Sequence, residues 1–156
     1  MINHSQLREL IIKPTLDKLV MNSDAAVELL LFTCAVESDG GSYLKQIKGP
    51  ALGIYQMEPA TYNDIWQNFI RLDNNLLLQF GIHFGAYRMP PEERLIYDLE
   101  FATAMARVHY RRVPKALPDA KIPNDIWEYY KKYYNTRQGS ADRSRCLAAY
   151  EKFIAN

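Results

Sequence analysis

One carboxylate occupies a position suited to acid catalysis: Glu37, followed by Ser38, ends an apolar run that is typical of a helix. Glu37 shares a helical face with Thr33 and Leu30, because residues four and seven apart lie above one another. Loss of water and the negative end of the helix dipole both favour the protonated carboxyl and raise its pKa. A carboxyl that keeps its proton near neutral pH can act as a general acid. The alternative is a glutamate that points into solvent, as most glutamates do.

The segment after this helix is rich in residues that let a ligand approach the backbone. Gly49, Ala51 and Gly53 have small side chains or none, so a long polymer can come close to their N–H and C=O groups. Gln56 adds an amide that both donates and accepts hydrogen bonds. Together with Glu37, the segment predicts a binding surface beside an acid.

Apolar periodicity and helix breakers predict that the elements around these residues are mainly α-helical. Expected helices lie at about residues 5–20, 23–39, 98–113, 124–136 and 141–155, with one more from Pro59 to a break at Asn74-Asn75. Between them, residues 40–58 are expected to form an extended loop or a small β-hairpin, since glycines and a proline interrupt the pattern.

The sequence makes further predictions about the shape of one expected helix and the exposed side of another. Pro14 is expected to kink or split the first helix, in which Leu7 and Leu10 recur at the spacing of a packed face. In the helix over residues 98–113, the arginines are expected to point outward into solvent: Arg107, Arg111 and Arg112. Clusters of this kind attract anionic surfaces without specificity.

The composition limits the function classes. A chain of 156 residues with 48% hydrophobic content suits one domain over residues 1–156. The net charge of +1 does not call for nucleic acid, and the scattered histidines and cysteines predict no metal site. No apolar stretch approaches the roughly 20 residues that cross a bilayer. The polar start MINHSQLREL lacks a Sec-type signal, so synthesis in the cytoplasm is expected.

The Glu37-Ser38 pair and the segment Gly49–Thr61, which reads GPALGIYQMEPAT, resemble the soluble lytic transglycosylase family of the lysozyme superfamily. In that family an E-S pair ends a helix and precedes a G-A-x-G-L-x-Q-x-x-P-x-T segment. The resemblance extends over about 25 residues. It implies a lysozyme-like, goose-type-lysozyme-like domain of about six to eight helices, similar to small phage-encoded members.

A third family element, Tyr-Asn-x-Gly, is similar to Tyr134-Asn135 near the end of the chain. Here the sequence departs from the family, because Gly139 follows four residues after Asn135 rather than two, and Tyr133 competes with Tyr134. The resemblance implies that Tyr134 hydrogen-bonds Glu37 and fixes its direction. The alternative for Tyr134 is an ordinary aromatic residue in a tyrosine-rich core.

The resemblance implies cleavage of the β-1,4 bond between N-acetylmuramic acid and N-acetylglucosamine in peptidoglycan, without a cofactor. Glu37 would protonate the glycosidic oxygen and then accept the proton of the muramoyl 6-hydroxyl, which closes a 1,6-anhydro ring. Such intramolecular attack can replace a second carboxylate, since effective molarities reach about 10⁵ to 10⁸ M. Two alternatives remain: a hydrolytic lysozyme (muramidase) that uses water, and a noncatalytic glycan-binding or virion structural protein.

The resemblance also implies substrate-binding residues around Glu37: Ser38, Gly53, Tyr55, Gln56, Met57, Tyr134 and Asn135. Gln56 and the backbone at Met57 would hold N-acetyl groups, and Tyr55 would offer a ring face to a sugar. Ser38 would orient Glu37 or a substrate group.

Two other acids lie close enough in sequence to serve as a second carboxylate, Asp39 and Glu58. Asp39 is expected to serve the turn at Gly40 instead, and Glu58 to cap the helix that starts at Pro59.

The expected partner is a peptidoglycan strand in the host periplasm. The protein would reach it from a phage particle, as a virion component, or from the cytoplasm after a holin-type protein opens the membrane.

Overall fold

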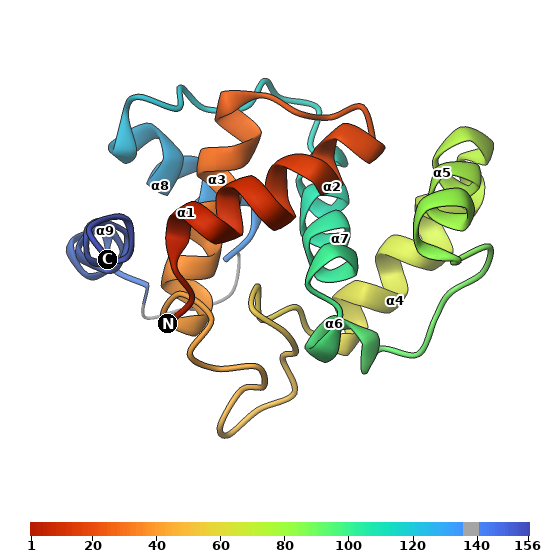
Figure 1. Ribbon diagram of the computed structural model, residues 1–156, viewed down its shortest axis with the longest axis horizontal. Coiled ribbons are helices and arrows are strands. Elements are labelled where there is room, and N and C mark those ends of the chain that lie inside the picture. Colours follow the sequence, from red (N-terminus) through yellow and green to blue (C-terminus); the bar gives the residue numbers. More distant parts are fainter. Residues whose placement is uncertain (136–140) are drawn as a thin grey trace.

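Helices make up most of the computed structural model, which describes residues 1–135 and 141–156 (Figure 1). They are α1 (His4–Gln6), the π-helical η1 (Leu7–Ile12), α2 (Lys13–Lys18), α3 (Asp24–Ser38), α4 (Pro59–Asn68), the 3₁₀ turn η2 (Ile70–Leu72), α5 (Asn74–Phe84), α6 (Arg94–Tyr97), α7 (Leu99–Arg111), α8 (Pro123–Tyr133) and α9 (Arg143–Ile154). The expected mainly α class is confirmed. None of the helices in the described ranges combines the length and apolar character needed to cross a membrane.

The first helix is continuous from α1 through η1 to α2, with π-helical spacing just before Pro14. Proline has no N–H and its ring crowds the carbonyl four residues earlier, and a π-helical turn is one way to change the hydrogen-bond ladder there. The N–H of Lys13 accordingly bonds to the carbonyl of Arg8. The altered turn brings Ile12 into the core and leaves Leu10 64% exposed, so the expected inward position of Leu10 is wrong.

Helix α3 is the central element, in contact with η1, α7, α8 and α9. It begins where the Ser23 hydroxyl accepts a hydrogen bond from the Ala26 N–H at 3.1 Å, and most of its residues are buried. It ends at Ser38 because the next three residues, Asp39 to Gly41, all have positive φ. Asp39 therefore serves the turn, as expected.

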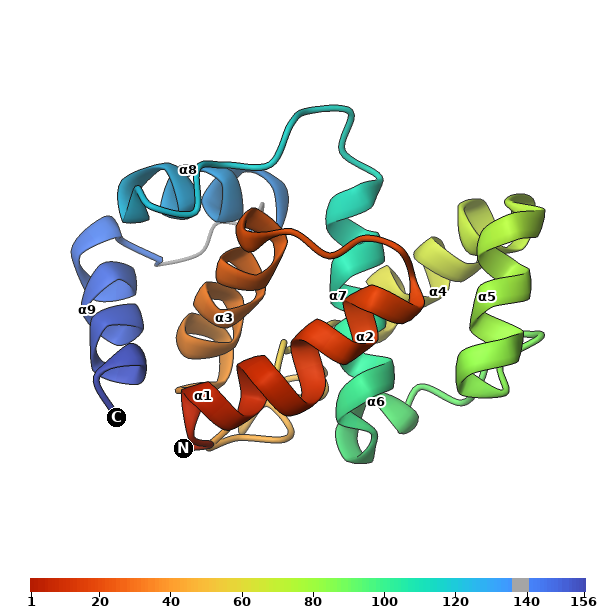
Figure 2. The ribbon, with the colours of Figure 1, turned by 45° about the horizontal axis from the view of Figure 1, so that its top comes forward.

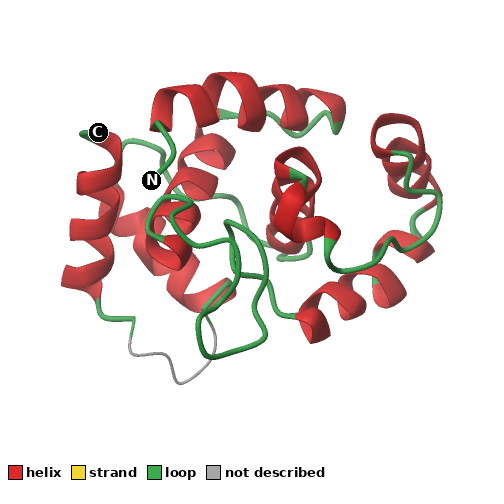
Figure 3. Cartoon of the chain, turned by 60° about the horizontal axis from the view of Figure 1, so that its bottom comes forward, coloured by secondary structure: helices red, strands yellow, loops and turns green. Residues whose placement is uncertain are grey.

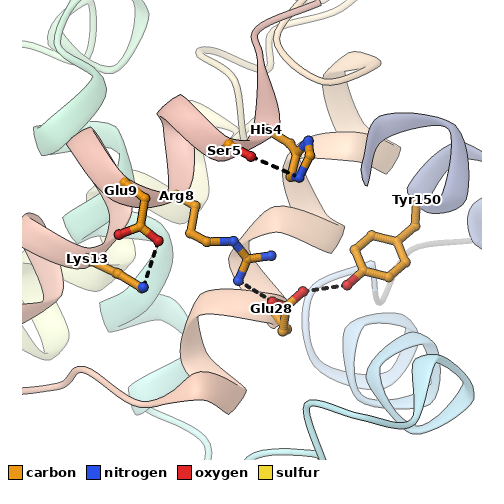
Figure 4. A network of polar contacts seen from close by, with 7 residues as sticks. All are labelled: His4, Ser5, Arg8, Glu9, Lys13, Glu28 and Tyr150. Atoms are coloured by element: carbon orange, nitrogen blue, oxygen red, sulfur yellow. Dashed lines mark hydrogen bonds and ion pairs between the residues drawn. The ribbon is translucent and has the colours of Figure 1, made fainter. Parts of the chain in front are cut away.

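A polar network ties the first helix to the two elements beside it (Figure 4). The Glu28 carboxylate of α3 accepts hydrogen bonds from Arg8 of η1 and from the Tyr150 hydroxyl of α9. In Figures 1 and 2 the first helix runs across α3 and α7, with α9 near its start. Glu28 thus joins three segments far apart in sequence, and its contacts fix the direction of α3.

Residues 39–58 form an extended loop that faces the viewer in Figure 3. Isolated antiparallel bridges join Leu52 to Lys45 and to Met57, and the described ranges contain no strand. Gly53 has φ +78°, and a Cβ there would lie 2.2 Å from the Leu95 carbonyl oxygen, so only glycine fits without displacement. The loop is thereby packed against the segment of α6.

The expected helix break at Asn74-Asn75 lies elsewhere. Helix α4 ends at Asn68, and Asp73 caps α5 by accepting a hydrogen bond from the Leu76 N–H at 3.0 Å. Asn74 is therefore the first residue of a helix rather than a break. In α7, Arg107 is buried with 8% exposure, so its expected outward position is also wrong.

Candidate active site

Glu37 lies in the last turn of α3, partly buried, at a cavity of about 310 Å³. The walls come from the end of α3, the 39–58 loop, α4, α7 and the end of α8. The lining residues are Glu37, Gln46, Ala51, Gln56, Met57, Glu58, Thr61, His109, Tyr134 and Asn135. The fold therefore brings the expected acid and the expected glutamine-bearing segment together.

Burial raises the pKa of Glu37 from 4.5 to about 7, because the charged form loses water. Hydrogen bonds from Tyr130 and Asn135 oppose this shift, since they stabilise the carboxylate, and the negative charge of Glu58 adds to it. The loss of water is the largest of these effects. At neutral pH the carboxyl is therefore close to half protonated, which suits a group that first donates and then accepts a proton.

The tyrosine that holds Glu37 is Tyr130, not Tyr134. The Tyr130 hydroxyl donates to Oε1 of Glu37 at 2.6 Å, while the Tyr134 hydroxyl donates to the Tyr55 carbonyl at 2.6 Å. The expected bond from Tyr134 is wrong because its hydroxyl is already used to hold the loop. The two tyrosines are four residues apart on α8 and its end, so periodicity places both on one face and cannot choose between them.

Asn135 completes this arrangement, with its Nδ2 donating to the Tyr130 hydroxyl at 3.2 Å. Its Oδ1 is buried without a hydrogen-bond partner in the described part of the chain. The ring of Tyr134 and the amide of Asn135 both line the cavity, as the Tyr-Asn element predicts. Gly139 of that element lies outside the described residues.

Ser38 does not line the cavity. Its side chain is buried, its hydroxyl lies 2.6 Å from the Ile54 carbonyl oxygen and 3.1 Å from that of Cys34, and it accepts from the Gly41 N–H at 2.9 Å. It therefore joins the end of α3 to the loop. Ser38 thus positions Glu37 through the backbone, from outside the cavity lining.

The loop residues divide into two groups. Gln56 and Met57 line the cavity, and Gln56 is held by a hydrogen bond from Nε2 to the Gly53 carbonyl at 2.8 Å. Tyr55 is only 1% exposed, and its hydroxyl lies 2.9 Å from Oγ1 of Thr103, so the expected sugar contact is wrong. Gly53 also stays outside the cavity lining, and its role is the close packing of the loop.

Glu58 occupies the N-cap position of α4, as expected, but its side chain makes no capping hydrogen bond there. It lines the cavity instead, on the same wall as Thr61. Its negative charge raises the pKa of Glu37, as the smallest of the four effects on that group. The site therefore contains a second carboxylate.

His109 of α7 also lines the cavity, although no sequence motif indicates it, since it lies on a helix remote from both motifs. Burial, together with the charge of Arg112, lowers its pKa to about 4, so the ring is neutral at neutral pH. Its Nδ1 is buried without a hydrogen-bond partner among the described residues. The ring packs edge-on against Tyr134, with centroids 5.1 Å apart. His109 therefore contributes a neutral aromatic ring to the cavity lining.

Two further hollows meet the cavity at Glu37. One, of about 260 Å³, is lined by Tyr130, Arg145 and Cys146 among others, and the other, of about 370 Å³, by Tyr43 and Lys48 among others. Because all three share Glu37, this residue lies where three adjoining hollows meet rather than at the bottom of one closed pocket. An extended ligand fits such a site better than a compact one.

Comparisons of the chain with protein-family models, with curated proteins and with solved structures found no match. The assignment of a function therefore depends on this geometry and on the two sequence motifs. Within the described residues, no group of three or more His, Cys, Asp or Glu side chains is arranged to hold a metal ion.

Proposed function

We propose that the protein cleaves the β-1,4 glycosidic bond between N-acetylmuramic acid and N-acetylglucosamine in peptidoglycan, as a lytic transglycosylase. The observation that carries this proposal is the partly buried Glu37, with a pKa of about 7, where three hollows meet. The Glu37-Ser38 and Gly49–Thr61 motifs supply the substrate class, because they resemble those of enzymes that act on this polymer.

In the proposed reaction, protonated Glu37 donates its proton to the glycosidic oxygen as the bond from that oxygen to the muramoyl C1 breaks. The muramoyl 6-hydroxyl oxygen then bonds to C1, and its proton passes to the Glu37 carboxylate. Tyr130 holds the carboxyl in place through both steps, since its hydroxyl can donate to the charged form. The negative charge of Glu58 favours the positive charge that develops on the sugar ring.

Glu58 also supports the second candidate, a hydrolytic lysozyme. Glycosidases that use water employ two carboxyl groups on either side of the bond, and Glu58 lines the same cavity as Glu37. In that reaction Glu58 would activate a water molecule in place of the muramoyl hydroxyl. The products distinguish the two reactions, because hydrolysis leaves reducing muramic acid ends and transglycosylation leaves 1,6-anhydro ends.

The decisive experiment digests purified peptidoglycan with the wild-type protein and with Glu37→Gln, and identifies the soluble fragments by mass spectrometry. We expect 1,6-anhydro ends from the wild type and a loss of about 10²- to 10⁴-fold for the variant, because the general acid is removed. Glu151→Gln, which changes an exposed carboxylate of α9, is the matched control and should keep full activity. Full activity of Glu37→Gln would contradict the proposal, and binding without fragments would identify a noncatalytic glycan-binding or virion protein.

A further inference from the structure

Arg107 of α7 is a buried cation whose donors are not satisfied. Its side chain is 8% exposed, and its Nε and Nη1 are buried without hydrogen-bond partners among the described residues. Burial lowers the pKa of this guanidinium, and the positive charge of Arg111 lowers it further. A buried charged donor without a partner is unfavourable, so the site favours a group that can accept its hydrogen bonds.

Arg107 lines a hollow of about 240 Å³ between the end of α7 and the segment that follows it. The lining residues are Arg107, Tyr110, Arg111, Val113, Lys115, Ala116 and Leu117. Three of these side chains are cationic and none is acidic. The Tyr129 hydroxyl of α8 donates to the Lys115 carbonyl at 3.1 Å, which holds this segment over the helix.

The hollow is separate from the cavity at Glu37, since the two share no lining residue. In Figure 2 the segment between α7 and α8 arches over the upper end of α7, while the loop between α3 and α4 lies at the lower end of the molecule. A ligand in the hollow would therefore not occupy the glycan site.

We propose that this hollow binds a phosphate group. A guanidinium presents N–H donors in a planar fork that matches the oxygens of phosphate, and two donors of Arg107 have no partner among the described residues. Three cations without a carboxylate among them favour a doubly charged anion over a singly charged carboxylate. The negative end of the α7 dipole opposes an anion here, but its effect is weaker than that of charge-assisted hydrogen bonds.

The test titrates inorganic phosphate into the ¹⁵N-labelled protein at constant ionic strength and follows the Arg107 Nε–H signal and the backbone amides of residues 113–117 by NMR. We expect saturable shifts at these positions, with acetate binding more weakly. Arg107→Gln should weaken phosphate binding about tenfold or more, because a charge-assisted hydrogen bond is lost. Lys115→Gln, at an exposed position, should weaken it about threefold, since exposed charges are partly screened.

Arg112→Gln is the matched control. Arg112 follows Arg111 in sequence but pairs with Asp64 at 2.9 Å and does not line the hollow, so its loss should change affinity less than twofold. Absence of saturable shifts, acetate binding as tight as phosphate, or equal losses in Arg112→Gln and Arg107→Gln would overturn the proposal. If Arg107→Gln does not fold, the phosphate affinities of Lys115→Gln and Arg111→Gln test the proposal. Wild-type affinity in both variants would overturn the proposal.

Vesicles of phosphatidylcholine with and without phosphatidylglycerol identify the source of the phosphate. If the anionic vesicles retain the wild-type protein and retain Lys115→Gln less well, the site exists and its ligand is a lipid headgroup. Phosphate binding without such retention supports the site with a soluble phosphate or phosphate monoester. Neither measurement uses a glycan, so their outcomes are independent of the proposed cleavage reaction.

Discussion

Tyr130 and Glu58 act on the Glu37 carboxyl in opposite directions. The Tyr130 hydroxyl donates to the carboxylate at 2.6 Å and so lowers the pKa of Glu37, while the negative charge of Glu58 raises it. Both effects are smaller than the loss of water, which raises the pKa to about 7. If Glu37 is the general acid, activity should fall as the pH rises through this value. Substitution of Tyr130 or Glu58 should change the pH at which activity falls.

Tyr130→Phe removes a donor to the charged carboxyl, so the pKa of Glu37 should rise and the alkaline limb of the pH profile of kcat/KM should move upward. We also expect kcat/KM at neutral pH to fall about tenfold, because a hydrogen bond to a charged group is lost. Fragment release from peptidoglycan at a series of pH values measures both effects. Tyr134→Phe is the control, since its hydroxyl bonds to the Tyr55 carbonyl, and an equal shift in that variant would contradict the assignment.

Glu58→Gln removes the negative charge that faces Glu37, so the pKa of Glu37 should fall and the alkaline limb should move downward. The same pH series measures this shift, with Glu151→Gln as the control. The products carry a second result. If Glu58→Gln still produces 1,6-anhydro ends, Glu37 is the only general acid and base. A fall in activity of about 10²-fold or more would instead assign Glu58 the role of general base.

The 39–58 loop holds its residues against Glu37 through two close contacts, the buried Ser38 hydroxyl on the Ile54 carbonyl and the bare Cα of Gly53 on the Leu95 carbonyl. Both contacts are to the backbone, so they fix the path of the loop rather than one side chain. The loop can therefore present Gln56 and Met57 to the cavity without regular secondary structure of its own.

Gly53→Ala should destabilise the protein by about 2–4 kcal/mol, the sum of a left-handed backbone strain and of overpacking. The added Cβ would meet the Leu95 carbonyl oxygen at 2.2 Å. Gly85→Ala is the matched control, because Gly85 also has positive φ, at +64°, but has nothing within 4 Å of an added Cβ. That variant should lose only about 1 kcal/mol. Urea unfolding of both measures the difference, and equal losses would show that the contact with Leu95 does not hold the loop.

Elements with a strong local signal could be predicted from the sequence. Helix α3 has a serine cap and a turn rich in glycine, and the 39–58 loop has glycines where the backbone requires them. The two wrong burial predictions have different causes, one local and one a contact with a later segment of the chain. Leu10 is exposed because the helix changes its spacing before a proline, and Arg107 is buried because the segment after α7 folds back over it.

Residues of the candidate site are predictable from the sequence where a local motif contains them, and not where distant packing places them. Glu37 and Gln56 are predictable, because their motif is local and resembles a known family. Tyr130 could not be separated from Tyr134, since both lie on one helical face and the Tyr134 hydroxyl is taken by the Tyr55 carbonyl of a distant loop. His109 could not be found at all, because it reaches the cavity only through the packing of α7 against α3.

The protonation of Glu37 couples the site to the stability of the whole molecule. The pKa of Glu37 is about 7 in the folded protein and near 4.5 in an unfolded chain, so between these values the folded state binds more protons. The free energy of unfolding should then decrease as the pH rises through this window. The shift corresponds to a loss of about 3 kcal/mol above pH 7.

Glu37→Gln removes this titration, while its amide oxygen can still accept the bond from Tyr130. The variant should match the wild type in stability near pH 4.5 and exceed it by up to about 3 kcal/mol above pH 7. Urea unfolding of both proteins across this range measures the difference, in which titration of other groups such as His109 cancels. A difference that does not change with pH would mean that the folded protein leaves the Glu37 carboxyl as acidic as in water, and the acid would then be missing from the proposed reaction at neutral pH.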